Sequence, residues 1–314
     1  MSELAFDAQR WLSSVHANGY QLGLPELLWY QHHTRLLDLS PGQQVHSKLA
    51  GSYLARSKGR GMEFDEVRHY QVGDDVRAID WRVTARTGRV HTKLFREERE
   101  RPVFLLTELT ESMRFGSSLL LKSVQAAHLA ALLAWHCKAN GDKLGGLVFS
   151  EQQHVLLKPL GRSRGVLRYL QALLDVHQQS RSNQGMVLST ALAELRRLLR
   201  PGSLLYILSD FATLDAEALR HLQVLSQHNE IHFCQLSDPL ELQLPSELQG
   251  EALVSAAQAL KVVQFNSQLK QRYQQQQQQA LATAKHSVLQ LGCKWLTLSS
   301  ASPLLSQLAG VYHD

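Results

Sequence analysis

The residues best suited to chemistry lie in one charged stretch, residues 59–100, where carboxylates and guanidinium groups alternate at short spacing. Among its charged residues, four acids alternate with four arginines: Glu63, Asp74, Asp75 and Asp80 with Arg68, Arg77, Arg82 and Arg86. Guanidinium groups pair with carboxylates through two parallel hydrogen bonds, and they also stack on flat rings such as Tyr70 and Trp81. The stretch therefore predicts a lattice of ion pairs that pins this segment against the sheet of the domain that follows it.

Two other interpretations of residues 59–100 stay open. The charges could form an exposed surface that docks a partner, or the acids could act in catalysis. We favour the lattice because structural ion-pair networks gather charged residues just as active sites do. Alanine substitution of Arg77 separates the first two interpretations, since loss of partner binding in a protein that still folds would contradict the lattice.

The rest of the chain contains none of the short motifs that mark common enzyme classes. It lacks the GxSxG of serine hydrolases, the HExxH of zinc peptidases, the GxxxxGK[ST] of nucleotide-binding loops and a GxGxxG after a predicted strand. The 15 histidines are scattered, and a lone histidine is more often structural than catalytic. We therefore expect a protein that is not an enzyme.

The elements that would position these residues alternate between strand and helix from residue 102 onward. Short apolar runs predict strands at 103–109, 144–150, 203–209, 231–236 and 294–298, with 154–158 as a hairpin partner. Helical spacing predicts helices at 117–140, 164–176, 187–199, 215–227 and 267–291. Strands separated by helices build a mostly parallel, doubly wound α/β sheet. The six-glutamine run at 274–279 is interpreted as a solvated face of the last of these helices.

Residues 1–101 have a different character. Residues 1–50 predict short helical pieces that are broken at Gly23-Leu24-Pro25 and at Pro41-Gly42. Residues 51–101 are dense in Gly, Arg and Asp, which predicts irregular structure with few long elements. We therefore expect an N-terminal segment over 1–101 and an α/β domain over 102–314.

The chain resembles a bacterial family known as domain of unknown function 58. The resemblance runs from about Gly51 onward and is carried by a motif at fixed spacing, formed by Gly61, Glu63, Phe64, Arg68, Tyr70, Gly73, Asp74, Asp75, Arg77, Asp80, Trp81 and Arg86. It implies a sheet of von Willebrand A type. It also implies a gene neighbourhood with MoxR-type AAA+ ATPases, which act on client proteins, but it implies no reaction.

The resemblance also implies a degenerate metal site. In von Willebrand A domains a DxSxS motif after the first strand, a later Thr and a late Asp hold Mg²⁺. The matching positions here are Glu108, Thr110, Ser112 and Asp210. The Thr position falls near Met186, although Ser189 or Thr190 could substitute. Mg²⁺ keeps water where protein ligands are missing, but it penalises displaced ligands. The alternative is that Thr110 and Ser112 cap the following helix.

Charge along the chain suggests the chemistry of a partner. The net charge is +5, and residues 158–200 hold eight Lys and Arg against two Asp and Glu. Arg162, Arg164 and Arg168 are expected to form a basic rim beside the carboxyl edge of the sheet, where doubly wound sheets bind ligands. Such a rim favours an acidic protein surface. No nucleic-acid motif accompanies the charge, so nucleic acid is not expected.

The remaining features concern location and class. Cys137, Cys234 and Cys293 are widely spaced among apolar neighbours, which predicts buried thiols in a reducing compartment. The N-terminus does not resemble a signal peptide, and the most apolar stretch, 119–137, is too interrupted for a membrane span. We therefore expect a cytoplasmic adaptor or scaffold that works with a MoxR-type ATPase. The alternatives are a metal-dependent hydrolase and a nucleic-acid-binding protein.

Overall fold

The computed structural model describes residues 7–34, 62–71, 74–97, 101–178, 186–256 and 259–311. The chain divides into two compact units, of which one contains the N-terminal residues together with everything from Arg101 onward. The other contains the segment between them. The sequence predicted that residues 1–101 form one segment, whereas the structure assigns the N-terminal helices to the sheet unit.

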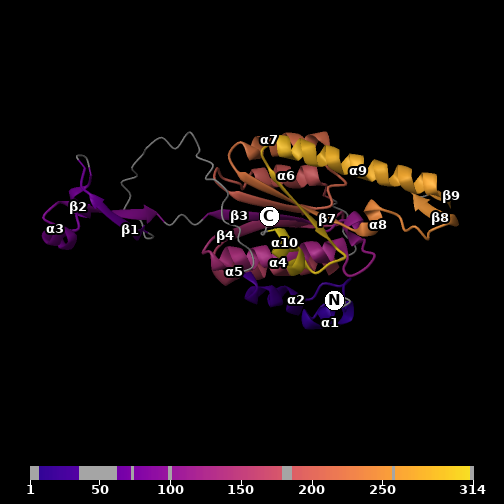
Figure 1. The fold of residues 1–314 in the computed structure, drawn as a ribbon, viewed down its shortest axis with the longest axis horizontal. Helices are drawn as coiled ribbons and strands as arrows, with labels where there is room; N and C mark the ends of the chain where they lie inside the picture. Colours follow the sequence, from indigo (N-terminus) through magenta and orange to yellow (C-terminus); the bar gives the residue numbers. More distant parts are fainter. Residues whose placement is uncertain are drawn as a thin grey trace, which may run out of the picture. The chain divides into compact units, whose positions relative to one another are not determined.

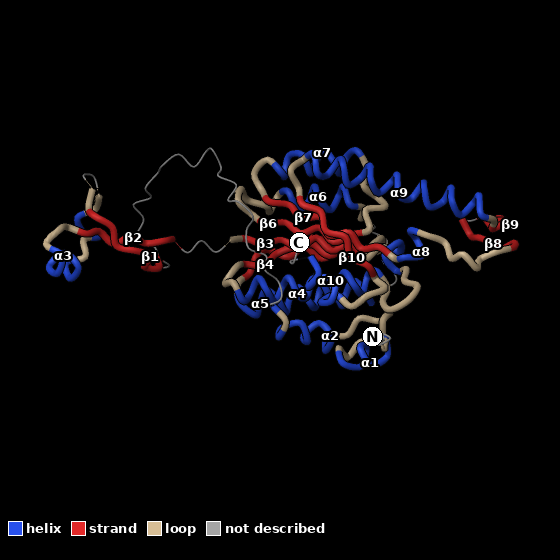
Figure 2. Tube along the Cα trace, viewed as in Figure 1, coloured by secondary structure: helices blue, strands red, loops and turns tan. Residues whose placement is uncertain are grey.

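A six-stranded sheet forms the centre of the larger unit (Figure 2). In spatial order the strands are β10 (Lys294–Ser299), β7 (Glu230–Ser237), β6 (Leu204–Ser209), β3 (Pro102–Glu108), β4 (Lys143–Phe149) and β5 (His154–Leu160). All neighbours pair in parallel except β5, which is antiparallel to β4. β3 lies in the middle and reads as a continuous apolar run because both of its faces are covered. The predicted doubly wound, mostly parallel sheet is confirmed.

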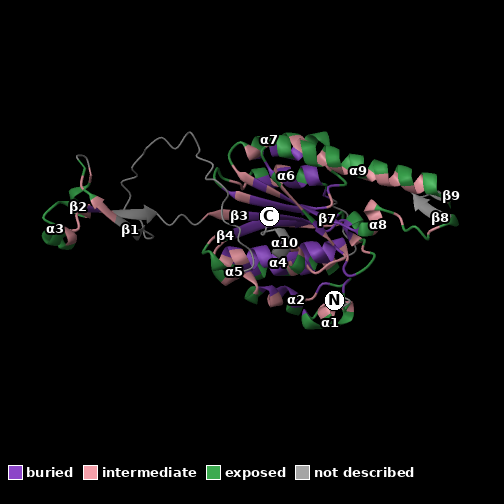
Figure 3. Ribbon diagram, viewed as in Figure 1, coloured by how far each residue is buried: buried purple, intermediate pink, exposed green. Residues whose placement is uncertain are grey.

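Helices cover both faces of this sheet (Figure 1). One face is covered by α4 (Lys122–Ala139), α5 (Arg162–Gln178) and α10 (Leu304–Val311), and the other by α6 (Leu188–Arg196), α7 (Ala216–Ser226) and α9 (Ser267–Gln290). Each face has its own hydrophobic cluster, and the buried residues concentrate on the strands and on the inner helices (Figure 3). The glutamine run lies within α9, on a largely exposed helix, as predicted.

The helix α4 is buried almost all round because the N-terminal residues cover its outer side. α1 (Ala8–Ser14), α2 (Leu24–Trp29) and the 3₁₀ turn η1 (Tyr30–His32) form this outer layer (Figure 1). Leu27 and Tyr30 are fully buried against α4. A break was predicted at Gly23-Leu24-Pro25, but a helix begins there, because Pro25 lies in its first turn, where the missing N–H costs nothing.

The sequence analysis did not predict α10, the 3₁₀ turn η4 (Glu111–Arg114) or three further elements of the larger unit. The short helix α8 (Pro239–Leu242) follows β7, and the antiparallel hairpin of β8 (Gly250–Ala256) and β9 (Ala259–Phe265) leads into α9. Figure 1 shows this hairpin at the N-terminal end of α9. All three cysteines are buried and unpaired, as predicted. None of the helices in the described ranges has the length and apolar character that a membrane span needs.

The smaller unit is more regular than the sequence indicated. β1 (Met62–His69) pairs with β2 (His91–Glu97) as an antiparallel hairpin, and the connection holds the 3₁₀ turn η3 (Val76–Ala78) and the helix α3 (Trp81–Thr87). α3 begins after Asp80, whose carboxylate accepts from the backbone N–H groups of Arg82 and Val83. It ends at Gly88 in the left-handed conformation, which glycine adopts without steric cost. Local capping therefore organises the charged stretch.

Candidate functional site

The carboxyl edge of the sheet brings together residues from distant parts of the chain. β3 ends at Glu108 and the neighbouring strand β6 ends at Ser209, with Thr107 opposite Leu208 in the parallel register. Glu108 therefore lies beside Ser209, and Asp210 follows in the next position. β7 ends beside β6, which adds Asp238 to the same edge.

Glu108 is a buried carboxyl held by hydroxyl groups. Its side chain is 1% exposed, and both of its oxygens accept hydrogen bonds. The Ser209 hydroxyl donates to Oε2, and the Thr110 hydroxyl donates to Oε1 over 2.9 Å. The exposed Ser112 hydroxyl lies 3.1 Å from that of Thr110. Burial raises the pKa of Glu108 to about 7, the Ser209 hydrogen bond opposes this rise, and the charge of Asp210 adds to it.

Asp210 contacts a buried lysine. Its Oδ2 lies 2.8 Å from the Nζ of Lys122, and its Oδ1 accepts from the backbone N–H of Ala212. The same Lys122 ammonium donates to Oε1 of Glu241 over 2.6 Å. Lys122 is 1% exposed, whereas the Glu241 side chain is 34% exposed. Sequence reasoning missed this group, although a lysine in the most apolar stretch of the chain was a signal that it must find a buried partner.

Asp238 connects the loop before α4 to the ends of β7 and β10. Its carboxylate accepts from the backbone N–H and the hydroxyl of Ser117, from the hydroxyl of Ser300 and from the N–H of Leu240. Burial by itself would raise the pKa of Asp238, but the hydrogen bonds from Ser117 and Ser300 outweigh it and lower the pKa. Ser117 is thereby drawn out of the helix predicted to begin there, and α4 begins at Lys122.

The smaller unit shows few of the predicted ion pairs. Arg68 pairs with Asp74 at 2.7 Å and Lys93 approaches Asp80 at 3.6 Å. Asp74, Asp75 and Asp80 all accept from backbone N–H groups, so these carboxylates organise turns. Backbone hydrogen bonds, from Gln71 and Val83 respectively, are the main cause that lowers the pKa of Asp74 and of Asp80. The predicted lattice is therefore wrong for most of the described charges.

The arginines that the lattice would have used are exposed. Arg77, Arg82 and Arg86 make no side-chain ion pair with any residue in the described ranges. Within those ranges no cation lies over the ring of Tyr70 or Trp81. Trp81 is 70% exposed, and Val76 nearby in the sequence is also exposed. The stretch thus presents an aromatic ring and three cationic side chains to solvent.

Not every motif residue is described. Gly61 and Gly73 lie outside the described residues. Glu63 and Phe64 lie in β1, where they pair in register with Arg96 and Phe95 of β2. Tyr70 donates a long hydrogen bond, 3.4 Å, to the carbonyl of Asp74.

Comparison with known proteins finds one family model that covers both the hairpin of β1 and β2, from residue 66 onward, and most of the central sheet. The family described as "Protein of unknown function DUF58" matches residues 66–284, which is most of the chain. The chain belongs to this family. The match spans α3, β2 and the whole sheet except β10, so the edge residues and most of the hairpin residues described above are part of the DUF58 region.

Relatives of this DUF58 chain occur in mycobacteria. It is 28% identical over 232 residues to "Uncharacterized protein Mb1516" of Mycobacterium bovis and to "Uncharacterized protein Rv1480" of Mycobacterium tuberculosis, covering 74% of this chain and 72% of each relative. Among solved structures, BatB from Bacteroides thetaiotaomicron aligns with a TM-score of 0.42 at 13% identity. An aerotolerance-related membrane protein from Bacteroides fragilis, with multiple mutations to serines, aligns with 0.41 at 16%. Each alignment covers 67% of this chain and 96% of the other.

The Mg²⁺ site implied by the resemblance does not fit these residues. Both oxygens of Glu108 accept from hydroxyl groups, and both oxygens of Asp210 are engaged, one of them by an ammonium. Met186 is buried in the hydrophobic cluster and offers no oxygen. Across the described ranges, no group of three or more His, Cys, Asp or Glu side chains is placed to hold a metal. The alternative role as helix caps is also wrong for Thr110, whose hydroxyl bonds to Glu108 and caps no backbone N–H.

The predicted basic rim lies elsewhere. β5 is antiparallel to β4, with Leu160 opposite Leu144, so the chain enters α5 beside the amino end of β4. Arg162 and Arg164 in the first turn of α5 are therefore at the opposite edge of the DUF58 sheet from Glu108. Arg168 lies further along the helix, at about 9 Å from Arg162 along the axis. All three side chains are exposed, but the predicted position beside the carboxyl edge is wrong.

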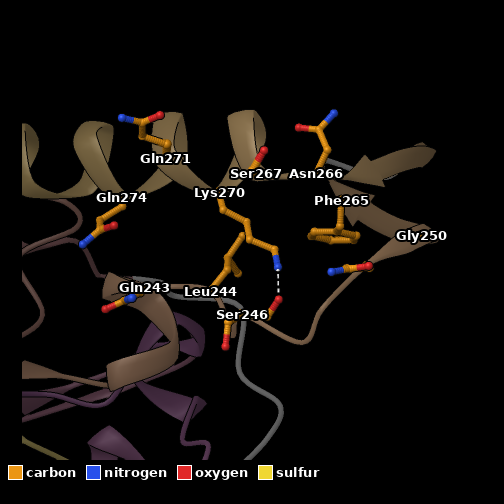
Figure 4. A pocket seen from close by; sticks show the side chains of 11 residues that line it. Gln243, Leu244, Ser246, Gly250, Phe265, Asn266, Ser267, Lys270, Gln271 and Gln274 are labelled. Carbon is orange, nitrogen blue, oxygen red and sulfur yellow. Dashed lines mark hydrogen bonds between the residues drawn. The ribbon is translucent and has the colours of Figure 1, made fainter.

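A cleft of about 640 Å³ lies between the loop after α8 and the start of α9 (Figure 4). Its lining includes Gln243, Ser246, Phe265, Asn266 and Lys270. The Lys270 ammonium reaches across it and donates to the carbonyl of Ser246 over 2.7 Å. The lining contains amide and hydroxyl groups but no carboxylate, histidine or thiol. Lys270 is the one charged side chain in this lining, and its ammonium is engaged by the Ser246 carbonyl.

Proposed function

We propose that this DUF58 protein is a non-enzymatic adaptor or scaffold that acts in the cytoplasm with a MoxR-type AAA+ ATPase, in the maturation or remodelling of client proteins. In this proposal the central sheet is of von Willebrand A type and supports the surfaces that bind partner proteins. The observation that carries it is the exposure of Trp81, at 70%, on a short helix beside arginines that make no ion pair with the described residues.

Trp81 and its neighbours have the composition of a protein-binding surface. Trp and Arg are enriched among the residues that contribute most to protein interfaces, whereas an exposed Trp contributes nothing to a monomer's core. Arg77, Arg82 and Arg86 have no described partner, so they favour an acidic surface opposite them. An acidic protein patch offers both the carboxylates and the apolar contact that this surface needs.

The test is direct binding to a MoxR-type ATPase encoded in the same genome, measured by biolayer interferometry. Trp81→Ala is expected to weaken binding at least 10-fold, which corresponds to about 1.4 kcal/mol. Tyr20→Ala is the matched control, because Tyr20 is another exposed aromatic residue but lies in the larger unit. Binding of the wild type should weaken with added salt, since the arginines contribute long-range attraction.

Two results would overturn the proposal. If the wild-type protein does not bind the ATPase, the partner is wrong. If Trp81→Ala and Tyr20→Ala both bind like the wild type, the Trp81 surface does not carry the contact. A gel shift with duplex DNA and single-stranded RNA at two salt concentrations tests the nucleic-acid alternative, which predicts tight binding that falls steeply with salt.

A further inference from the structure

Lys122 occupies an unusual position for a cation. It lies in the first turn of α4, where the helix dipole is unfavourable to positive charge, and its side chain is 1% exposed. A buried ammonium is tolerated only when opposite charges and hydrogen bonds replace the lost water. Here Asp210 and Glu241 supply them at 2.8 Å and 2.6 Å. The two carboxylates must therefore hold the ammonium strongly enough to outweigh both its burial and the dipole.

We infer that the carboxyl edge of the sheet is a cation site whose resident cation is the Lys122 ammonium in place of a divalent metal ion. Asp210 and Glu241 are its ligands. The ammonium joins the start of α4, the loop after β6 and the helix α8, which are segments that no other described ion pair connects. This inference goes beyond the proposed function and does not depend on it.

The surrounding groups support an ammonium and oppose a divalent ion. A Mg²⁺ ion needs free oxygens at about 2.1 Å in octahedral geometry, whereas both oxygens of Asp210 already accept hydrogen bonds. A dication near Asp210 would also be repelled by the Lys122 charge.

Glu241 is the ligand most open to change. It is 34% exposed and sits on the four-residue helix α8, where its other oxygen accepts from the N–H of Asp238 over 3.3 Å. Asp210, by contrast, is 8% exposed and fixed by its strand end. Removing the lysine would leave two carboxylates facing the space of the ammonium, and a divalent cation is the natural replacement for the lost charge.

The experiment compares thermal unfolding of the full chain in EDTA and in millimolar Mn²⁺. The wild type is expected to melt at the same temperature in both. Lys122→Ala is expected to melt at least about 5 °C lower in EDTA. Mn²⁺ should recover part of this loss, and electron paramagnetic resonance should count one bound Mn²⁺. Lys122→Ala combined with Asp210→Asn should lose the Mn²⁺ response. Lys158→Ala, at an exposed lysine, should behave as the wild type.

Several outcomes would overturn the inference. These are an Asp210-dependent rise in the melting temperature of the wild type with Mn²⁺, a Lys122→Ala variant that melts like the wild type in EDTA, or one that folds but does not respond to Mn²⁺. If Lys122→Ala does not fold in EDTA, two further measurements test the inference. These are refolding of Lys122→Ala in Mn²⁺ and thermal unfolding of the milder Glu241→Gln variant. Glu241→Gln should melt below the wild type, and an unchanged melting temperature would contradict a ligand role for Glu241.

Discussion

The ammonium of Lys122 lies 2.8 Å from a carboxylate oxygen of Asp210, although 88 positions separate the two residues in the chain. This contact places a fixed positive charge where the family resemblance had implied a metal ion. It also ties the largely buried helix α4 to the end of β6, which lies beside Glu108 at the end of β3. The edge of the sheet is therefore built around an internal ion pair.

Breaking this ion pair should destabilise the protein strongly. Asp210→Ala leaves the buried Lys122 charge with the partly exposed Glu241 as its remaining carboxylate, and we expect a loss of about 3 kcal/mol in the free energy of unfolding. Urea denaturation measures it. Asp175→Ala, which removes an exposed carboxylate from α5, is the matched control and should change stability by less than about 0.5 kcal/mol. Equal stabilities for the two variants would contradict the role of the pair.

Glu108 should make stability depend on pH in a defined window. Its pKa rises from 4.5 in the unfolded chain to about 7 in the folded protein, so the folded state holds the proton more tightly. Stability from this group is complete below pH 4.5 and is lost as the pH rises to 7, by about 3 kcal/mol. Glu108→Gln should remove this slope between pH 5 and 8, as measured by urea denaturation. Glu217→Gln, at an exposed position, should leave the slope unchanged.

The buried hydroxyl of Ser300 should contribute measurably to stability. It donates to Asp238 over 2.7 Å, and hydrogen bonds to charged groups are worth about 1.5–3 kcal/mol. Ser300→Ala should therefore lower the free energy of unfolding by about 2 kcal/mol. Ser306→Ala removes an exposed hydroxyl that donates to the backbone carbonyl of Pro303, and it should cost less than about 0.5 kcal/mol. If both substitutions cost the same, Asp238 does not depend on Ser300.

Arg77 and Arg68 should differ in what they do for the hairpin. The Arg77 side chain has no described partner, so Arg77→Ala should leave hydrogen exchange of the β1 and β2 amides unchanged. Arg68→Ala removes the 2.7 Å pair with Asp74 and should speed exchange at residues 67–71. Faster exchange in Arg77→Ala would restore the lattice interpretation.

Much of the sheet could be predicted because its signals are local. The apolar run at 103–109 favours a strand whichever strands it pairs with. Gly141, which has a positive φ, follows the end of α4, as the sequence indicated. The turn at 150–154, which joins the antiparallel strands β4 and β5, could be predicted for the same reason. Local signals failed for β8 and β9, whose residues lack a clear alternation, and for Pro25, which begins a helix where a break was predicted.

The edge site could be predicted only in part. Glu108, Thr110 and Asp210 were identified because the family resemblance implied a metal site at these positions, and the ends of parallel strands share one edge of the sheet. The sequence could not show which charged side chains pair with one another. Lys122, Asp210 and Glu241 come from three separate segments, and their pairing depends on how helix α4 and helix α8 pack at the sheet edge. Strands and helices are determined largely by residues that are close in sequence. The partners in an ion pair depend on which residues the tertiary structure brings close in space.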